Sequence, residues 1–200
     1  MGARKHHYIL EHLDQLTGSL VEIGAGRSEG STDFYAGLAA GKPDLQYHSV
    51  DFDPEAMTVM KSYADRIQNM HVYQMLGEKF LQEVFPDLNE QIAYAYLDNF
   101  DWIFVPIPPW VESQIRRYRE FDLVLNNENS QLAHYNQTKL IVEHAADRCI
   151  IQFDDTFVVR DEKEQSIYSG KGGTAVPYLV SLGWRVVYRE SNSVALANWQ

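Results

Sequence analysis

The chain has 200 residues, 45% of them hydrophobic, and its 17 basic against 28 acidic side chains give a formal net charge of -11. This excess of acid argues against a nucleic-acid partner, because DNA and RNA are bound mainly through Lys and Arg. No apolar run approaches the length of a membrane span or forms a signal-peptide core, so we expect no membrane partner, a cytoplasmic location and a single domain over residues 1–200. The one cysteine, Cys149, precedes an apolar pair and is expected in the core.

Hydrophobic patterning predicts alternating helices and strands. Apolar residues at helical spacing indicate a first helix over residues 5–16, which Gly18 ends. Strands are then expected at 20–23, 45–50, 70–74, 92–97, 149–153, 184–188 and 194–197, and helices over 31–40, 54–66, 78–85, 130–146 and 173–182. Helical crossovers imply a mostly parallel sheet, whereas the short link 190–193 requires a hairpin. The expected fold class is therefore α/β: a Rossmann-like doubly wound sheet of about seven strands with an antiparallel C-terminal hairpin strand.

The segment from residue 20 to 32 breaks from a strand into a glycine turn and then opens a helix. Gly24 and Gly26 allow the backbone to approach a ligand closely. The third glycine, Gly30, comes one residue later than in a dinucleotide fingerprint. Glu22, just before the turn, would repel a pyrophosphate and suits a cationic ligand. These features favour a nucleoside cofactor other than a dinucleotide.

Two aspartates follow the second predicted strand. Asp51 comes at the distance from the glycine turn at which a carboxylate accepts hydrogen bonds from a ribose diol. Asp53 precedes Pro54 and is expected to cap the helix that begins there, since Asp before Pro is a common helix start.

Three motifs in this order resemble the cofactor motifs of class I S-adenosylmethionine-dependent methyltransferases. They are Glu22-Ile23-Gly24-Ala25-Gly26 with Gly30, the run from Val50 to Met57, and Gly77-Glu78. The resemblance implies that the glycine turn holds the methionine part, that the acid after strand two holds the ribose, and that residues after strand three flank the adenine. It implies the cofactor-binding residues Glu22, Gly24, Ala25, Gly26, Asp51, Phe52, Gly77, Glu78 and Asp98.

Further carboxylates follow the fourth and fifth strands. Asp98, Asp154 and Asp155 would meet if those strands are neighbours, and clustered carboxylates repel each other without a cation such as Mg²⁺ or Ca²⁺. The motifs are similar to those of the methyltransferase branch that includes catechol O-methyltransferases and cephalosporin-hydroxylase-like proteins. That resemblance implies a divalent ion at these three residues that positions a substrate oxygen. The alternative for 154–156 is a turn that caps its own backbone.

The connection over residues 100–130 is unusually long and is read as an insertion. Its aromatic and proline-rich part, 102–110, is expected to form a lid over the acceptor or an interface, with an extra helix closing the core as the alternative. The basic cluster 116–119 is expected on the solvated face of a short helix. Asn129 or Ser130 is expected to cap the helix that follows.

A second polar stretch, 160–169, is predicted as a flexible rim loop. Thr174 is expected to cap the next helix, and Lys171 to contact the acceptor. The function predicted is methyl transfer from S-adenosylmethionine to a small-molecule acceptor, at oxygen and assisted by a divalent metal, with Asp98, Asp101 and Lys171 as catalytic residues. The alternatives are a non-catalytic protein that binds S-adenosylmethionine or S-adenosylhomocysteine, and a nicotinamide-dependent oxidoreductase. A homo-oligomer is left open.

Overall fold

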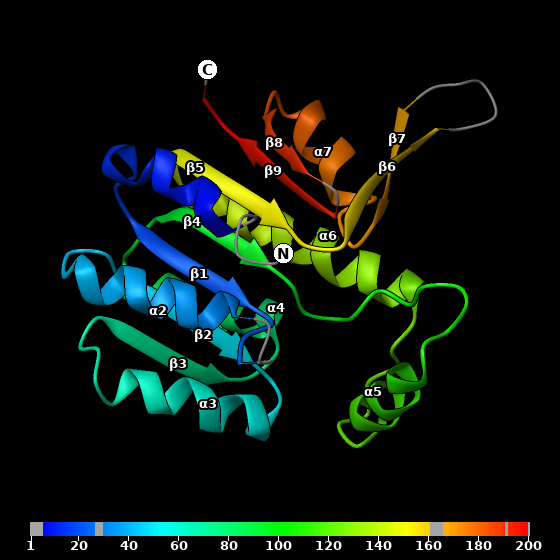
Figure 1. Ribbon diagram of the computed structural model, residues 1–200. Coiled ribbons are helices and arrows are strands. Elements are labelled where there is room, and N and C mark those ends of the chain that lie inside the picture. The colour runs from blue at the N-terminus through cyan, green and yellow to red at the C-terminus, as the bar shows by residue number, and fades with distance from the viewer. Residues whose placement is uncertain (1–5, 27–29, 161–165, 191, 200) are drawn as a thin grey trace.

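The structure is a computed structural model that describes residues 6–26, 30–160, 166–190 and 192–199 (Figure 1). A seven-stranded sheet lies at its centre, in the order β3-β2-β1-β4-β5-β9-β8. Strands β1 to β5 pair in parallel, and β9 lies antiparallel between β5 and β8. The expected fold class is confirmed. The strands are β1 (Ser19–Ile23), β2 (Tyr47–Asp51), β3 (Met70–Gln74), β4 (Ile92–Leu97), β5 (Ala145–Phe153), β8 (Arg185–Glu190) and β9 (Ser193–Ala197).

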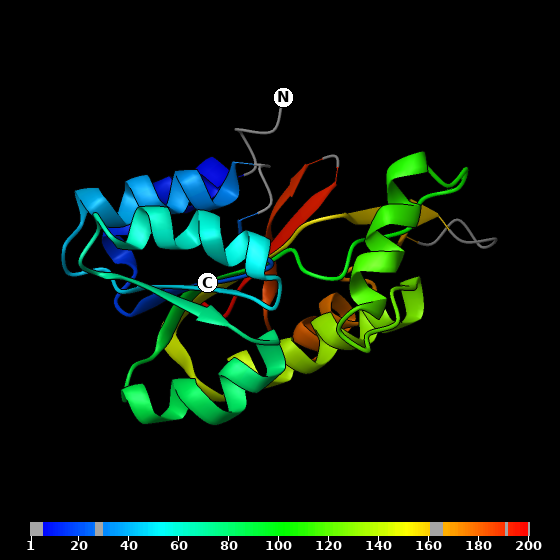
Figure 2. The same ribbon diagram turned by 90° about the horizontal axis from the view of Figure 1, so that it is seen from below.

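Helices cover both faces of the sheet, as Figure 2 shows. One face packs against α2 (Ser31–Gly41) and α3 (Pro54–Ala64), and its core includes Tyr35 and Met60. The other packs against α6 (Asn127–Glu143), α7 (Ala175–Ser181) and a short helical run. Because both faces are covered, the central strands β1 and β4 are buried along their whole length. The short run comprises α4 (Gly77–Lys79), the π-helical η3 (Phe80–Val84) and the 3-10 helix η4 (Phe85–Leu88).

Helix ends differ from the expectations at three points. Instead of one α-helix, the N-terminal segment forms two 3-10 helices, η1 (His7–Glu11) and η2 (Leu13–Gln15), neither with a side-chain cap. Helix α6 begins earlier than expected because Asn126, not Asn129 or Ser130, is its cap and accepts the Asn129 N–H at 2.7 Å. Thr174 makes no side-chain cap hydrogen bond; its hydroxyl instead donates to the Gln131 carbonyl at 3.3 Å.

Both ends of the loop predicted over 160–169 belong to a β-hairpin. Strands β6 (Thr156–Arg160) and β7 (Ser166–Gly170) pair antiparallel with Thr156 opposite Gly170, and residues 161–165 lie outside the described part of the chain. The β-branched and aromatic residues of both strands favour this pairing. In the sequence, the charged run over 161–165 separates the two strands, so the pattern predicts a loop over the whole stretch.

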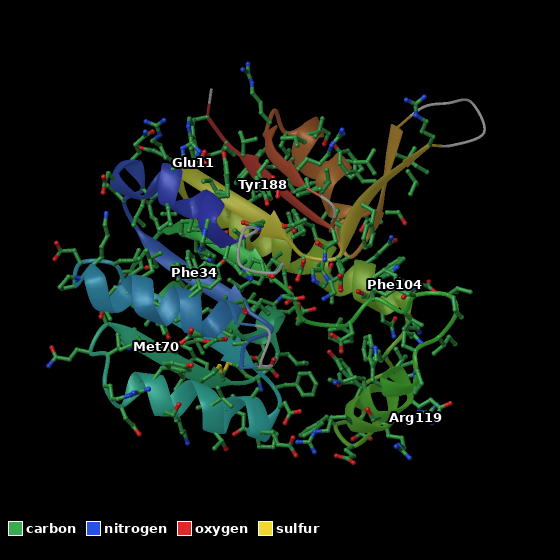
Figure 3. The ribbon with its side chains drawn as sticks, in the orientation of Figure 1. Glu11, Phe34, Met70, Phe104, Arg119 and Tyr188 are labelled. Carbon is green, nitrogen blue, oxygen red and sulfur yellow. The ribbon has the colours of Figure 1, made fainter. Side chains whose placement is uncertain are left out.

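The insertion at 100–130 contains one helix, α5 (Pro109–Arg119), with proline at its first position. Figures 1 and 2 show α5 beyond the carboxyl ends of the parallel strands, away from the two helical layers. Phe104, labelled in Figure 3 on the connection that leads to α5, packs its ring against Phe157 of β6 at a centroid distance of 5.6 Å. The insertion and the β6–β7 hairpin therefore meet beyond the edge of the sheet where the site is predicted.

Cys149 lies in the core, as expected, and is fully buried. Nowhere in the described ranges does a helix combine the length and apolar character that crossing a bilayer requires.

Candidate functional site

The carboxyl ends of β2, β1 and β4 form a switch point in the strand order. The chain leaves β1 for a helix on one face and leaves β4 for the opposite face, and ligands of doubly wound sheets bind at such a point. Backbone hydrogen bonds join the ends: the Gly24 N–H donates to the Val50 carbonyl at 2.9 Å, and the Asp98 N–H donates to Ile23 at 2.8 Å. The predicted cofactor residues that follow these three strands therefore lie together at the carboxyl-terminal end of the sheet, which we call the edge of the site.

The glycine turn is set by contacts within the chain. Gly24 and Gly26 have φ angles of 95° and 74°, which favour glycine. A Cβ on Gly24 would lie 2.3 Å from the Asn99 nitrogen, and one on Gly26 would lie 2.6 Å from the Ala56 carbonyl oxygen. Ala25, between them, is fully buried. Glycine is thus required at both positions because the backbone after β4 and the backbone of α3 lie so close to the turn. The structure ties both glycines to packing within the chain.

Glu22 is placed behind the turn. Its side chain is fully buried, and its Oε2 accepts hydrogen bonds from the hydroxyls of Tyr47, Thr32 (3.0 Å) and Ser49 (3.2 Å). Thr32 in turn accepts the Gly26 N–H at 2.8 Å. Burial raises the pKa of the Glu22 carboxyl, against the opposing effect of these hydroxyls. Through Thr32, Glu22 therefore helps to hold the glycine turn in place, and its predicted contact with the cofactor stays a prediction.

The two aspartates after β2 make different contacts. Asp53 caps α3 by accepting the Glu55 N–H at 2.8 Å. Asp51 is 3% exposed and its Oδ1 accepts the Asp53 N–H at 2.8 Å. Capping by Asp53 is confirmed, and ribose binding by Asp51 stays a prediction.

Helix α5 is attached over the end of β2. Arg117 forms a two-point ion pair with Asp53, with Nε 2.9 Å from Oδ2 and Nη2 2.6 Å from Oδ1. The ring of Phe52, a predicted cofactor residue, lies 5.0 Å from Tyr118 and 5.2 Å from Phe121 between centroids. Only part of the basic cluster is solvated: Arg119, labelled in Figure 3, is exposed, whereas Arg117 is bound to Asp53. The insertion therefore covers the β2 end of the site.

The residues after β3 lie on the opposite helical layer. A Cβ on Gly77 would lie 2.4 Å from the Ile23 side chain, so this glycine allows α4 to pack on β1. Glu78 Oε2 accepts the side-chain amide of Gln137 at 3.0 Å, and burial raises the pKa of Glu78. A cavity of about 360 Å³ opens beside Glu78, lined also by Leu76 and Phe100. Glu78 is thus available to a ligand at the β3 end.

The carboxylates expected at the ends of β4 and β5 do come together, because these strands pair with Leu97 opposite Phe153. Asp98 is 8% exposed and Asp154 is 2% exposed. Tyr96 of β4 donates its hydroxyl hydrogen to Asp154 Oδ2 at 2.9 Å and lies 3.5 Å from Asp98 Oδ2.

A lysine lies among these acids. The Nζ of Lys171 is 2.5 Å from Asp98 Oδ1 and 3.4 Å from Asp155 Oδ2, and the residue is 1% exposed. Burial lowers the pKa of Lys171, but the charge of Asp98, followed by those of Asp155, Asp101 and Asp154, outweighs burial and holds the pKa well above its ordinary value. Lys171 is therefore a buried ammonium bound to carboxylates, and its predicted contact with an acceptor stays a prediction.

This lysine explains why the predicted metal site is not confirmed. Mg²⁺ or Ca²⁺ would bind carboxylate oxygens at about 2.0–2.6 Å, in the space between Asp98 and Asp155 that Lys171 Nζ takes. Within residues 6–26, 30–160, 166–190 and 192–199, no three His, Cys, Asp or Glu side chains form a group suited to a metal ion. The turn alternative has support, since the Thr156 hydroxyl donates to the Asp154 carbonyl at 2.9 Å.

The sequence does not single out His134 of α6, which lies close to the acids. Its Nδ1 donates to the Ser130 carbonyl at 2.7 Å, so Nε2 holds the lone pair, and this buried atom has no hydrogen-bond partner among the described residues. Burial, then the positive charge of Lys171, lower the pKa of His134 to about 3. In the sequence His134 looks like an ordinary helix position. Tyr96 could have been found, because it precedes Asp98 by two positions on one strand face.

We expect His134 to destabilise the fold in acid. The unfolded chain protonates this ring near pH 6.5, whereas the folded ring stays neutral down to about pH 3, so the free energy of unfolding falls with decreasing pH between these values. The slope reaches about 1.4 kcal/mol per pH unit for one proton. Urea unfolding at several pH values between roughly 7 and 5 measures this slope. The free energy of unfolding should depend less steeply on pH for His134→Gln than for wild type. Equal slopes would contradict the assignment.

Comparison with known proteins bears on the fold. No model of a known family and no curated protein matches the sequence. CalS11, a TDP-rhamnose 3'-O-methyltransferase of calicheamicin biosynthesis, aligns with a TM-score of 0.59 at 11% identity, covering 98% of this chain and 78% of CalS11. SMU.1697c, a methyltransferase candidate from Streptococcus mutans solved with S-adenosylhomocysteine, aligns with a TM-score of 0.58 at 12% identity, covering 98% of this chain and 99% of its own.

At these identities the similarity establishes the fold. This chain has the Rossmann-like fold of class I S-adenosylmethionine-dependent methyltransferases, including the antiparallel strand near the C-terminus. The finer resemblance to the catechol O-methyltransferase branch stays a prediction.

Proposed function

We propose that the chain is an S-adenosylmethionine-dependent methyltransferase that acts on a small-molecule acceptor, at oxygen. The main support is an unsatisfied polar atom beside the glycine turn. Asn99 is 4% exposed, its backbone closely approaches Gly24, and its Oδ1 has no hydrogen-bond partner in the described part of the chain. A buried amide oxygen without a partner is costly, and the amino group of the cofactor's methionine part is a donor that would satisfy it.

The remaining residues of the edge suit the same ligand. When bound, S-adenosylmethionine supplies an electrophilic methyl group on a positively charged sulfur. Asp51 would accept hydrogen bonds from its ribose, and Glu78 lies at the cavity where its adenine would fit. Carboxylates along the edge favour a cationic ligand electrostatically. The fold that this chain shares with CalS11, by name a sugar O-methyltransferase, supports oxygen as the acceptor atom.

Asp101 is the residue that we assign to the acceptor. Asp98 and Lys171 are buried and bound to each other, whereas Asp101 is partly exposed and close enough for its charge to affect the pKa of Lys171. Its carboxylate would take the proton that an acceptor hydroxyl loses. Alignment of donor and acceptor would supply most of the remaining rate enhancement. Helix α5 and the β6–β7 hairpin would exclude water above them.

Calorimetric titration with S-adenosylhomocysteine tests the proposal. Wild type should bind it, and Asp51→Ala should weaken binding about 10- to 100-fold, because a ligand's hydrogen bonds to a charged group contribute about 1.5–3 kcal/mol. Asp65→Asn, an exposed acid at the end of α3, is the matched control and should bind like wild type.

Two outcomes would contradict parts of the proposal. Absence of binding of either S-adenosylmethionine or S-adenosylhomocysteine to the wild type would remove it entirely. Binding without transfer of methyl groups to a panel of phenols, sugars and amines would instead identify a non-catalytic binding protein. Titration with NADH, followed by fluorescence, checks the oxidoreductase alternative.

A further inference from the structure

The segment around Lys171 is built to place this side chain among the acids. A Cβ on Gly170 would lie 1.9 Å from the Asp155 carbonyl oxygen, and one on Gly172 would lie 2.8 Å from the Thr156 hydroxyl. The Lys171 N–H donates to Asp155 O at 3.0 Å, and the Gly172 N–H donates to the Thr156 hydroxyl at 2.9 Å. Glycines on both sides therefore allow the backbone to press against the turn after β5, and two hydrogen bonds fix it there.

The ammonium of Lys171 uses its bonding capacity within the cluster. An ammonium has three donors, and Nζ lies 2.5 Å from Asp98 Oδ1, 3.3 Å from the Asp98 carbonyl oxygen and 3.4 Å from Asp155 Oδ2. Asp154, which Lys171 does not reach, is bonded to Tyr96. The acids that would ligate an ion are thus bonded by groups of the chain itself, two of them by the Lys171 ammonium.

We propose that Lys171 takes the place of a divalent cation at the ends of β4 and β5. The wild-type chain then binds no Mg²⁺ or Ca²⁺ there, and removal of the ammonium without refilling its space turns the acids into a divalent-cation site. The consequence that methyl transfer needs no metal rests on the proposed function, whereas cation binding does not.

A pair of variants tests this directly by thermal unfolding in EDTA, CaCl₂ or MnCl₂. Lys171→Ala leaves space between Asp98 and Asp155, and millimolar cation should raise its Tm by about 5–10 °C over the value in EDTA. Lys171→Met fills the space with an uncharged chain and should show no such rise. Lys171→Ala combined with Asp155→Asn lacks one ligand and should lose most of the rise. Wild type should shift by less than about 1 °C.

Other results would overturn the proposal. One is a saturable rise in the wild-type Tm that Asp155→Asn abolishes. Another is a folded Lys171→Ala protein that gains no stability from any of the cations, or gains no more than Lys171→Met. If Lys171→Ala does not fold in EDTA or in cation, Tb³⁺ luminescence of the wild type decides: sensitised emission that Ca²⁺ competes and that Asp155→Asn abolishes would refute the replacement, and absence of such emission would support it.

The same samples keep this inference separate from the proposed function. We expect the affinity of wild type for S-adenosylhomocysteine to be equal in EDTA and in MgCl₂. Loss of that binding in both conditions would contradict the proposed function and leave the cation replacement standing. If the wild type bound a cation at this site and kept its affinity for S-adenosylhomocysteine, the cation replacement would be contradicted and the proposed function would stand.

Discussion

Gly24→Ala should destabilise the protein by more than about 4 kcal/mol or prevent folding. Its φ of 95° costs an L-residue about 1–2 kcal/mol. In addition, the new Cβ would lie 2.3 Å from the Asn99 nitrogen and 2.4 Å from the Asp98 carbonyl carbon. These are backbone atoms directly after β4, held by the bond from the Asp98 N–H to the Ile23 carbonyl, and they cannot move aside cheaply. Urea unfolding measures the loss. Any folded fraction should also bind S-adenosylhomocysteine weakly, because β4 would be displaced from the turn.

Substitutions at two other glycines separate the cost of the positive φ from the cost of the steric clash. Gly30 has a φ of 89° but open space at its Cβ, so Gly30→Ala should cost only about 1 kcal/mol. Gly37 lies on the exposed side of α2 with open space, so Gly37→Ala should stabilise the protein by up to about 1 kcal/mol. If Gly24→Ala cost no more than Gly30→Ala, the close approach of β1 and β4 would be refuted.

Glu22→Ala should cost at least about 3 kcal/mol and weaken cofactor binding as well. The change removes the shared acceptor of three buried hydroxyls, those of Thr32, Tyr47 and Ser49. Each buried donor left without a partner costs about 1–3 kcal/mol. Thr32 would then be free to release the Gly26 N–H, so the glycine turn should loosen. Unfolding in urea and titration with S-adenosylhomocysteine measure the two effects.

Glu22→Gln is the matched control. Its side-chain amide has the same shape and keeps an oxygen that accepts hydrogen bonds. Burial raises the pKa of Glu22, which means that the site disfavours the charged form of the carboxyl, so an uncharged amide should be tolerated there. We expect Glu22→Gln to retain most of the stability and affinity. If Glu22→Gln and Glu22→Ala lost cofactor affinity equally while remaining stable, the negative charge itself would be acting on the ligand, as the sequence first suggested, and the positioning role would be wrong.

The strands are predictable because their signals are local. The apolar and β-branched runs of β1 to β5 and the glycine turn at residues 24–26 fix the parallel half of the sheet within a few residues. The link 190–193 likewise fixes the hairpin of β8 and β9. Acids after the strands could be assigned to one edge for the same reason, because parallel strands end together.

The contents of the acidic cluster could not be predicted from local signals. Lys171 follows a hairpin whose pattern is concealed by charged residues, and nothing near it in the sequence indicates that its side chain turns inward toward Asp98. Helix α5 shows the same limit. Its ion pair between Arg117 and Asp53 joins residues 64 positions apart, and a basic cluster is ordinarily solvated. Contacts of this kind depend on the completed fold.

The position of Lys171 also determines when the acidic edge can form during synthesis. Asp98 and Lys171 are 73 positions apart, so a nascent chain can pair β1 to β4 long before the lysine has been made. Until β6 and β7 deliver it, the carboxylates after β4 and β5 repel each other at close range. The half of the edge beside Gly24 can therefore mature early, whereas the half beside Asp154 is completed only by the last third of the polypeptide.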